Sequence, residues 1–468
     1  MDALTRIKDA AAAARQPAAM LPLRLSDIAA RAAPRYTSYP TAPQFEESVD
    51  AQAYGRWLET LSGSDAPASL YLHVPYCRSI CSYCGCAAKA TLRDEPLVAF
   101  AARLRREIAL VAERAGPLTV THLHWGGGTP NVLPADLFRR VLDDIRARFA
   151  LAPGAEHAVE IDPRHLTPET IATLAAGGVT RVSLGVQDFD PAVQQAIGRV
   201  QPFEMVRAAV EGLREAGLAG LNMDLIYGLP LQTLGSIRDT AARAAALRPD
   251  RIALFGYAHV PWMRPHQRLL DEAALPDPAL RVELAETARE TLLDAGYVAI
   301  GIDHFARPDD GLATALADGA LRRNFQGYTT DDAPVLLGFG PTAIGRLPQG
   351  YVQNVADIAG WGRAVDERRL PVARGRALTP DDRLRGAVIE SLLCVFEVDL
   401  DGIARRHGAS PDVFAPALAE LETLRRQGFV ALAGGRLTIL HDGPALARIV
   451  ASAFDAYLTT SARHSLAV

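Results

Sequence analysis

The sequence predicts an α/β protein whose central feature is a sheet of parallel strands. Apolar runs with the character of buried strands recur along the chain, and a segment with helical periodicity follows each of them. The runs occupy residues 69–74, 120–125, 157–161, 181–186, 221–227 and 251–257. Six strand–helix units in succession imply parallel strands joined by right-handed crossovers. Such units fit either an incomplete barrel or a doubly wound sheet, and the periodicity does not separate these two folds.

The first helices can be placed from the spacing of their apolar residues. One predicted helix spans residues 95–114, and the next begins near Pro134, after which Leu137, Val141 and Ile145 recur four residues apart. That spacing places the three side chains on one helix face, as packing against a sheet requires.

Beyond about Arg374 the composition changes, and strands no longer alternate with helices. A helix over residues 380–395 and two shorter helices precede two apolar runs within 429–440, which flank Gly434 and Gly435. A glycine pair between apolar runs predicts a β-hairpin, so the chain is expected to end in a mainly helical, winged-helix-like domain. The predicted domains are an N-terminal extension (1–67), an α/β domain (68–375) and a C-terminal helical domain (376–468).

Charge and hydropathy argue against nucleic acid and membrane as partners. The formal net charge is −5, and from Ala377 onward nine Arg and Lys residues oppose eleven Asp and Glu residues. A domain that binds a phosphate backbone needs a positive patch, so we expect the C-terminal domain to serve as a lid or packing element. Polar residues or glycines interrupt every apolar run before it could span a membrane, and Asp2, Asp9 and Arg15 interrupt the Ala-rich start. These patterns predict a cytoplasmic protein.

Cysteine usage points to a metal site. Four of the five cysteines (Cys77, Cys81, Cys84 and Cys86) lie within ten residues, and the fifth, Cys394, lies in an apolar stretch typical of a core. A disulfide framework would distribute its cysteines along the chain. Cys77, Cys81 and Cys84 follow a strand with the spacing C-x3-C-x2-C.

Three thiolates on a short loop can bind three irons of a 4Fe–4S cubane and leave the fourth iron without a protein ligand. S-adenosylmethionine (SAM) can chelate that iron through its amino and carboxylate groups, and an electron from the cluster then cleaves SAM to methionine and a 5′-deoxyadenosyl radical. The alternative is a structural zinc site with Cys86 as the fourth ligand. Structural zinc sites usually draw ligands from two separate segments, and no second pair of cysteines exists here.

A glycine run and two carboxylates extend the candidate site. Gly126–Gly128 follow the second predicted strand, where glycines would let the backbone approach a ligand such as the SAM aminocarboxylate. Glu160 and Asp224 lie at apolar strand ends, where an unpaired carboxylate is costly. Their partners are either a ribose hydroxyl or ammonium group of a ligand, or a helix N-terminus or Arg of the protein. Since ligands bind at the carboxyl ends of parallel strands, the clustering of unusual residues at strand ends favours a functional site.

These residues fall in motifs that resemble the oxygen-independent coproporphyrinogen III oxidases (dehydrogenases) of bacterial haem synthesis. The likeness extends from residue 35 to the C-terminal domain. It rests on RYTSYPTA (35–42), YLHVPYCRSICSYCGC (71–86), HLHWGGGTP (122–130), VEIDPR (159–164), SLGVQDF (183–189), MDLIYGLPLQT (223–233), YAHVP (257–261), DHFARPDD (303–310) and NFQGYTT (324–330).

The resemblance implies a three-quarter (β/α)6 radical SAM barrel with an N-terminal extension and a helical C-terminal domain. It implies oxidative decarboxylation of the ring A and B propionates of coproporphyrinogen III to vinyl groups, which gives protoporphyrinogen IX. Each decarboxylation would consume one SAM, and an external acceptor would take the remaining electron. The resemblance also implies a monomer and an electron donor such as a flavodoxin or ferredoxin system.

The resemblance further implies two SAM molecules and assigns residues to each. Contacts to the cluster-bound SAM would come from Tyr71, Gly127, Glu160 and Ile344. The second SAM would lie against Tyr83, Gly128, Thr129, Gln187, Arg199, Asp224 and Ala258. Tyr83 stands where the family often has Phe, and Cys86 matches a cysteine that does not bind the cluster, so its role stays open.

A related haem chaperone shares the cysteine, GGGTP and GVQ motifs and is the main rival. Cys86 directly after Gly85, together with the motifs at 35–42, 304–310 and 324–330, favours the oxidase. A regulator that binds DNA through the C-terminal domain is disfavoured by that domain's negative charge.

Overall fold

A computed structural model describes residues 33–458, and a central sheet dominates it. The sheet has 12 strands, and the six predicted strands lie side by side and parallel at its centre. They are β1 (Ala68–Val74), β4 (Thr119–Gly127), β5 (Ala150–Ile161), β6 (Arg181–Gln187), β7 (Gly220–Tyr227) and β8 (Arg251–Gly256). The prediction of six parallel strand–helix units is therefore confirmed.

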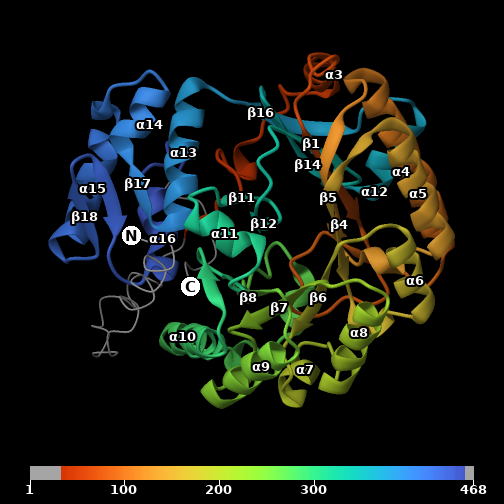
Figure 1. The fold of residues 1–468 in the computed structure, drawn as a ribbon, viewed down its shortest axis with the longest axis horizontal. Coiled ribbons are helices and arrows are strands. Elements are labelled where there is room, and N and C mark those ends of the chain that lie inside the picture. Colours follow the sequence, from red (N-terminus) through yellow and green to blue (C-terminus); the bar gives the residue numbers. More distant parts are fainter. Residues whose placement is uncertain (1–32, 459–468) are drawn as a thin grey trace.

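Helices cover the outer face of the parallel strands. They are α4 (Glu95–Ala115), α5 (Ala135–Arg148), α6 (Pro168–Ala176), α7 (Pro191–Ala196), α8 (Phe203–Glu215), α9 (Leu234–Ala246) and α10 (Pro278–Asp294). In Figure 1 they follow one another around the outside of the sheet, from α4 at the right to α10 at the lower left. The predicted helix over 95–114 and the predicted helix start near Pro134 are both confirmed.

The barrel is incomplete because short strands extend the sheet at both sides instead of closing it. Beyond β8 lie β10 (His304–Ala306) and β9 (Val298–Ile300), both antiparallel to their neighbours. Beyond β1 lie β13 (Val335–Phe339), which is parallel to β1, then β14 (Ile344–Leu347), β15 (Gly350–Asn354) and β16 (Val372–Ala377). Within the described residues β9 and β16 end the strand order without pairing to each other. The incomplete barrel, and not the doubly wound sheet, is the observed fold.

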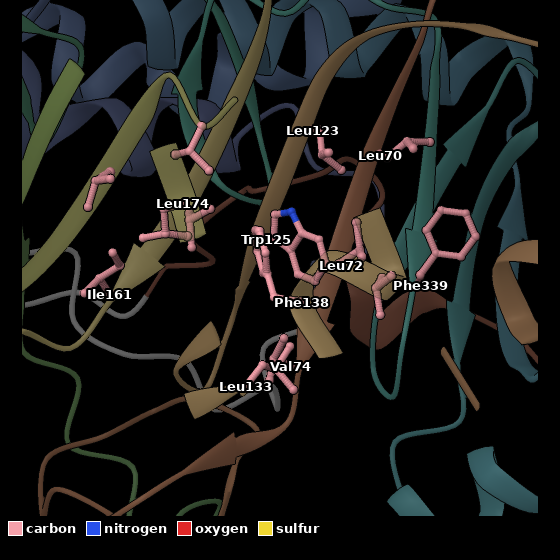
Figure 2. Close-up of a cluster of buried hydrophobic side chains, with 14 of the residues drawn as sticks. Leu70, Leu72, Val74, Leu123, Trp125, Leu133, Phe138, Ile161, Leu174 and Phe339 are labelled. Atoms are coloured by element: carbon pink, nitrogen blue, oxygen red, sulfur yellow. The ribbon is translucent and has the colours of Figure 1, made fainter. Parts of the chain in front are cut away.

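Strand alternation separates an apolar outer face from a polar inner face. Leu72 and Trp125 point outward and are fully buried, and Trp125 packs on Phe138 of α5 with ring centroids 4.6 Å apart (Figure 2). Successive side chains of a strand point to opposite faces, so Tyr71 and His124, one residue earlier in each strand, point inward. The same alternation in β5, β6 and β7 turns most of their polar residues inward, and those inward side chains keep partial exposure. A polar, solvent-accessible interior is the result.

The C-terminal domain lies at the left of Figure 1, beside the barrel. It comprises α13 (Pro380–Val395), β17 (Glu397–Asp399), α14 (Leu400–Arg406), α15 (Ala415–Arg426), β18 (Val430–Ala433), β19 (Arg436–Ile439) and α16 (Gly443–Ser452). Both the predicted helix over 380–395 and the hairpin around the glycine pair are confirmed, since β18 and β19 pair antiparallel. Cys394 is buried at 3% exposure, as a core cysteine should be.

The N-terminal segment packs into the C-terminal domain. Ala33, Tyr36 and Tyr39 belong to that domain's hydrophobic core. The Tyr36 hydroxyl lies 3.0 Å from a carboxylate oxygen of Asp455, and Arg448 Nε donates to the Pro34 carbonyl oxygen at 3.1 Å. Tyr36 and Asp455 are therefore in contact although they lie 419 residues apart in the sequence.

The remaining elements are short or lie at the periphery. They are α3 (Ala51–Glu59), β2 (Tyr76–Cys77), β3 (Lys89–Ala90), α11 (Gly311–Ala317), β11 (Arg322–Asn324), β12 (Gly327–Thr329), α12 (Ile358–Asp366) and six short 3-10 helices. Across residues 33–458, none of the helices combines the length and apolar character needed to cross a membrane.

Candidate functional site

The cysteine loop begins where β1 ends, at the carboxyl edge of the parallel strands. Cys77 is the last residue of β2. Side chains from the loop after β8 hold residues 83–85, further along the cysteine loop. Three side chains of that later loop bind carbonyl oxygens of the cysteine loop: Gln267 Nε2 to Tyr83 at 2.9 Å, His266 Nε2 to Cys84 at 2.7 Å and Arg264 Nε to Gly85 at 2.8 Å. The cysteines are thus fixed by contacts from the far side of the barrel.

Each of the three predicted ligand sulfurs accepts its own hydrogen bond. The Thr129 hydroxyl donates to Cys77 Sγ at 3.3 Å, and the Cys86 backbone N–H donates to Cys84 Sγ at 3.3 Å. Cys81 Sγ accepts from two guanidinium groups, Arg164 Nη2 and Arg199 Nη1, each at 3.5 Å. Donors aimed at sulfur favour the thiolate over the thiol.

The donor set fits an iron–sulfur cluster better than a single zinc ion. Within residues 33–458, no three His, Cys, Asp or Glu side chains converge as the ligands of one metal ion would. In a cubane each thiolate binds a different iron, so a cluster does not need three ligands that converge on one metal ion. Two buried guanidinium groups face Cys81 and share the carboxylate of Asp162, and a negatively charged cluster would balance the positive charge that remains. The hydrogen bond with Cys86, helped by His266 and Arg199, also lowers the pKa of the Cys84 thiol.

The three glycines are required by protein groups of the site itself, two side chains and one backbone carbonyl. A Cβ at Gly126 would lie 2.6 Å from Glu160 Oε1, and one at Gly128 would lie 2.5 Å from the Tyr76 carbonyl oxygen. Gly127 has a φ of +107°, and a Cβ there would lie 2.6 Å from the His73 ring. Close packing around the cysteine loop therefore explains the run without any ligand, a reason that the sequence pattern did not reveal.

Glu160 is held in the barrel interior by a histidine side chain and a backbone N–H. Its carboxylate oxygens lie 3.0 Å from His124 Nε2 and 3.2 Å from the Gly127 backbone N–H. Tyr71 lies beside this pair, with its ring centroid 5.8 Å from that of His124 and its hydroxyl 3.2 Å from His73 Nδ1. The Glu160 side chain remains 38% exposed, so one side of the carboxylate is open to a ligand.

Asp224 is a second interior carboxylate. It accepts hydrogen bonds from Ser183 Oγ at 3.1 Å and Asn222 Nδ2 at 2.8 Å. Burial, with a smaller contribution from the negative charge of Glu160, raises the pKa of Asp224 to about 6. Within the described part of the chain, neither carboxylate pairs with Arg or Lys or caps a helix. Two such carboxylates favour a positively charged ligand, and SAM carries a sulfonium and an ammonium group.

The other predicted contact residues surround the same edge. Tyr83 packs beside the apolar cluster that contains Ile197 and Tyr257, and Arg199 donates from Nη2 to the Gly185 carbonyl oxygen at 2.6 Å. Gln187 ends β6 with a φ of 69°. Ala258 lies two residues beyond the end of β8, and its carbonyl oxygen accepts from Gln267 Nε2 at 3.2 Å. Ile344 begins β14 and lies outside the hydrogen-bonded network of the site.

Several side chains that build the site received no role from the sequence. His73 lies two residues after the predicted contact Tyr71 on β1, and His124 lies two residues after His122 on β4. Polar side chains at such spacing within apolar strands share one face. This signal could have identified His73 and His124 as side chains of the barrel interior. Asp162, Arg164 and His266 carried no comparable signal.

Comparison with known proteins agrees with this geometry. The profile of the Radical SAM superfamily matches residues 71–244, and that of the HemN C-terminal domain matches residues 378–439. A Bradyrhizobium diazoefficiens protein named oxygen-independent coproporphyrinogen III oxidase is 51% identical over 437 residues, which cover 93% of this chain and 97% of the relative. A Paracoccus denitrificans protein of the same name is 44% identical over 436 residues, 93% of this chain and 96% of the relative.

A solved structure with the same architecture is that of coproporphyrinogen III oxidase (HemN) from Escherichia coli, described as a radical SAM enzyme. The two folds superpose with a TM-score of 0.86 at 38% sequence identity, over 91% of this chain and 98% of the other.

Proposed function

The chain belongs to the oxygen-independent coproporphyrinogen III oxidases, which are radical SAM enzymes, and from this premise we propose its reaction and the residues that serve it. The reaction is oxidative decarboxylation of the ring A and B propionates of coproporphyrinogen III, which gives protoporphyrinogen IX. Each propionate loses one β-hydrogen atom, CO2 and one electron and becomes a vinyl group. The observation that carries the proposal is the set of three sulfurs, each with its own donor, beside the Glu160–Asp224 pair.

We propose Cys77, Cys81 and Cys84 as the cluster ligands. Their spacing in the sequence and the donors on each sulfur support this assignment. When bound, the cluster and SAM supply a carbon radical strong enough to remove hydrogen from an unactivated C–H bond. The contacts from Gln267 and His266 to the cysteine loop hold the sulfurs in position.

Two SAM molecules are proposed, with the two interior carboxylates as their main charged contacts. Tyr71, Gly127, Glu160 and Ile344 would serve the cluster-bound molecule. Tyr83, Gly128, Thr129, Gln187, Arg199, Asp224 and Ala258 would surround the second. The open side of Glu160 and the raised pKa of Asp224 support cation binding at both carboxylates.

The remaining assignments rest on the family resemblance. They are a one-electron donor such as a flavodoxin or ferredoxin system, an external electron acceptor, a monomeric state and a cytoplasmic location. The domain division at residues 67 and 375 is likewise a proposal. Residues 33–39, which this division assigns to the N-terminal extension, pack on the core of the C-terminal domain.

The test is anaerobic reconstitution with iron and sulfide, followed by reductant, SAM and coproporphyrinogen III. The proposal predicts about four irons per chain, release of 5′-deoxyadenosine and two CO2 for each protoporphyrinogen IX formed. Stoichiometric haem binding without turnover would favour the chaperone instead. Zinc as the bound metal would overturn the assignment of the cysteines.

A further inference from the structure

Cys81 differs from the other two proposed ligands in the charge of the groups that donate hydrogen bonds to its sulfur. Neutral donors, the Thr129 hydroxyl and the Cys86 backbone N–H, reach Cys77 and Cys84. Cys81 instead accepts from two guanidinium groups, and its own residue is only 6% exposed. A cation at a buried sulfur acts through a low dielectric and is screened little by salt.

Asp162 organises the two guanidinium groups. Its carboxylate accepts from Arg164 Nη2 at 2.6 Å and Arg164 Nε at 3.0 Å, and from Arg199 Nη1 at 3.2 Å. Asn131 fixes the Asp162 backbone by bonding its N–H at 3.1 Å and its carbonyl oxygen at 3.2 Å. The side chains of Arg164, Asp162 and Arg199 are 13%, 6% and 7% exposed. The arrangement is rigid and carries one excess positive charge.

Arg164 has no assigned role, whereas Arg199 is a proposed SAM contact. The side-chain contacts of Arg164 in the described residues are to Asp162 and to the Cys81 sulfur. Neutralisation of Asp162 alone would not require the second guanidinium group. The positive charge that remains is directed at the sulfur.

Resting on the proposed function, we propose that Arg164 is a positioning residue that raises the reduction potential of the cluster through its hydrogen bond to Cys81. A one-electron reduction adds negative charge to the cluster, and a fixed cation and N–H donor at a ligand sulfur stabilise the reduced form more than the oxidised form. Arg164 thereby makes transfer of the first electron from the donor more favourable. The pKa of Arg164, which stays raised despite burial because of Asp162 and Cys81, is consistent with a charged group there.

The test is a redox titration of the reconstituted protein without SAM, with titanium(III) citrate as reductant and the EPR signal of the reduced cluster as readout. Arg164→Gln should make the midpoint potential more negative by about 59 mV, which corresponds to a tenfold change in the one-electron reduction equilibrium. Arg164→Lys keeps the charge and should shift it by less than half as much. Arg78→Gln is the matched control, because Arg78 lies in the cysteine loop beside Cys77 but pairs with Asp94 at 2.8 Å.

The outcomes separate this inference from the proposed function. A wild-type protein without a reducible cluster would overturn both. A wild-type cluster with Arg164→Gln at the potential of the Arg78→Gln control would overturn the role of Arg164 and leave the proposed function intact. Loss of the cluster in both Arg164 variants would also overturn the inference, since the residue would then serve assembly and not the potential.

Discussion

Replacing Glu107 with alanine should destabilise the protein by about 3–5 kcal/mol. Glu107 lies on α4 and is 1% exposed. Its carboxylate accepts from the Gly340 N–H at 2.8 Å, from Trp361 Nε1 at 3.0 Å and from Asn354 Nδ2 at 2.6 Å. The change removes the acceptor and leaves three buried donors, each of which costs roughly 1–3 kcal/mol when unsatisfied.

The loss can be measured from the shift of the urea midpoint of the apoprotein at constant slope. Glu113→Ala is the control, because this residue lies on the same helix, is exposed and pairs with Arg368 at only 3.5 Å. The control should change stability by less than about 0.5 kcal/mol. A loss below about 1 kcal/mol in Glu107→Ala would refute the reasoning. Since Gly340 precedes Ile344 in the turn from β13 to β14, SAM binding should weaken as well.

The same carboxyl group predicts a pH dependence. Burial, opposed by the three hydrogen bonds, raises the pKa of Glu107 from 4.5 to about 7. Between these values the native protein keeps a proton that the unfolded chain releases, so this contribution to stability is full below about pH 4.5 and is lost as the pH rises toward 7. Glu107→Gln cannot titrate, so its loss of stability from pH 5 to pH 7 should be smaller than in the wild type by roughly 2 kcal/mol. Parallel curves would contradict the raised pKa.

Three predictions concern the site directly. Cys77→Ala should abolish the brown cluster absorbance and reductive SAM cleavage, whereas Cys394→Ala should keep both; an active Cys77 variant would contradict the ligand assignment. Gly126→Ala places a Cβ 2.6 Å from Glu160 Oε1, so it should weaken SAM binding by about tenfold (roughly 1.4 kcal/mol) at unchanged iron content, as equilibrium dialysis can measure. Asp224→Asn should weaken SAM binding at pH 7.5. In the wild type SAM affinity should fall below about pH 6, because the Asp224 carboxylate is protonated at its raised pKa, and the variant should lack this fall. A variant whose SAM affinity falls below pH 6 as in the wild type would refute the role of this group.

The barrel could be predicted because the sequence patterns that specify its strands and helices are local. Alternation and helical spacing place the six strands and the first helices, and the same period predicts that Glu160 and Asp224 point inward. The cysteine loop is equally local, since all three proposed ligands lie within eight residues.

The donors around that loop could not be predicted, because tertiary structure alone brings them together. Arg164 and Arg199 reach Cys81 from 83 and 118 residues away along the chain. The strands β14 to β16 are short and antiparallel, and their pattern does not distinguish them from loops. The sequence shows the glycine run but not the groups that pack against it, since His73 and Tyr76 approach Gly127 and Gly128 only in the folded protein.

The adjacency of residues 33–39 and the last helix has a consequence for biosynthesis. During translation Tyr36 and Tyr39 leave the ribosome hundreds of residues before Asp455 and Ala456, the groups that their hydroxyls contact. The barrel core can therefore form while these aromatic rings are still uncovered, and residues 33–39, although translated early, pack last. A nascent chain that stalls near residue 376 would expose this segment to proteases and chaperones, and a fragment that starts at residue 376 would lack part of its own core.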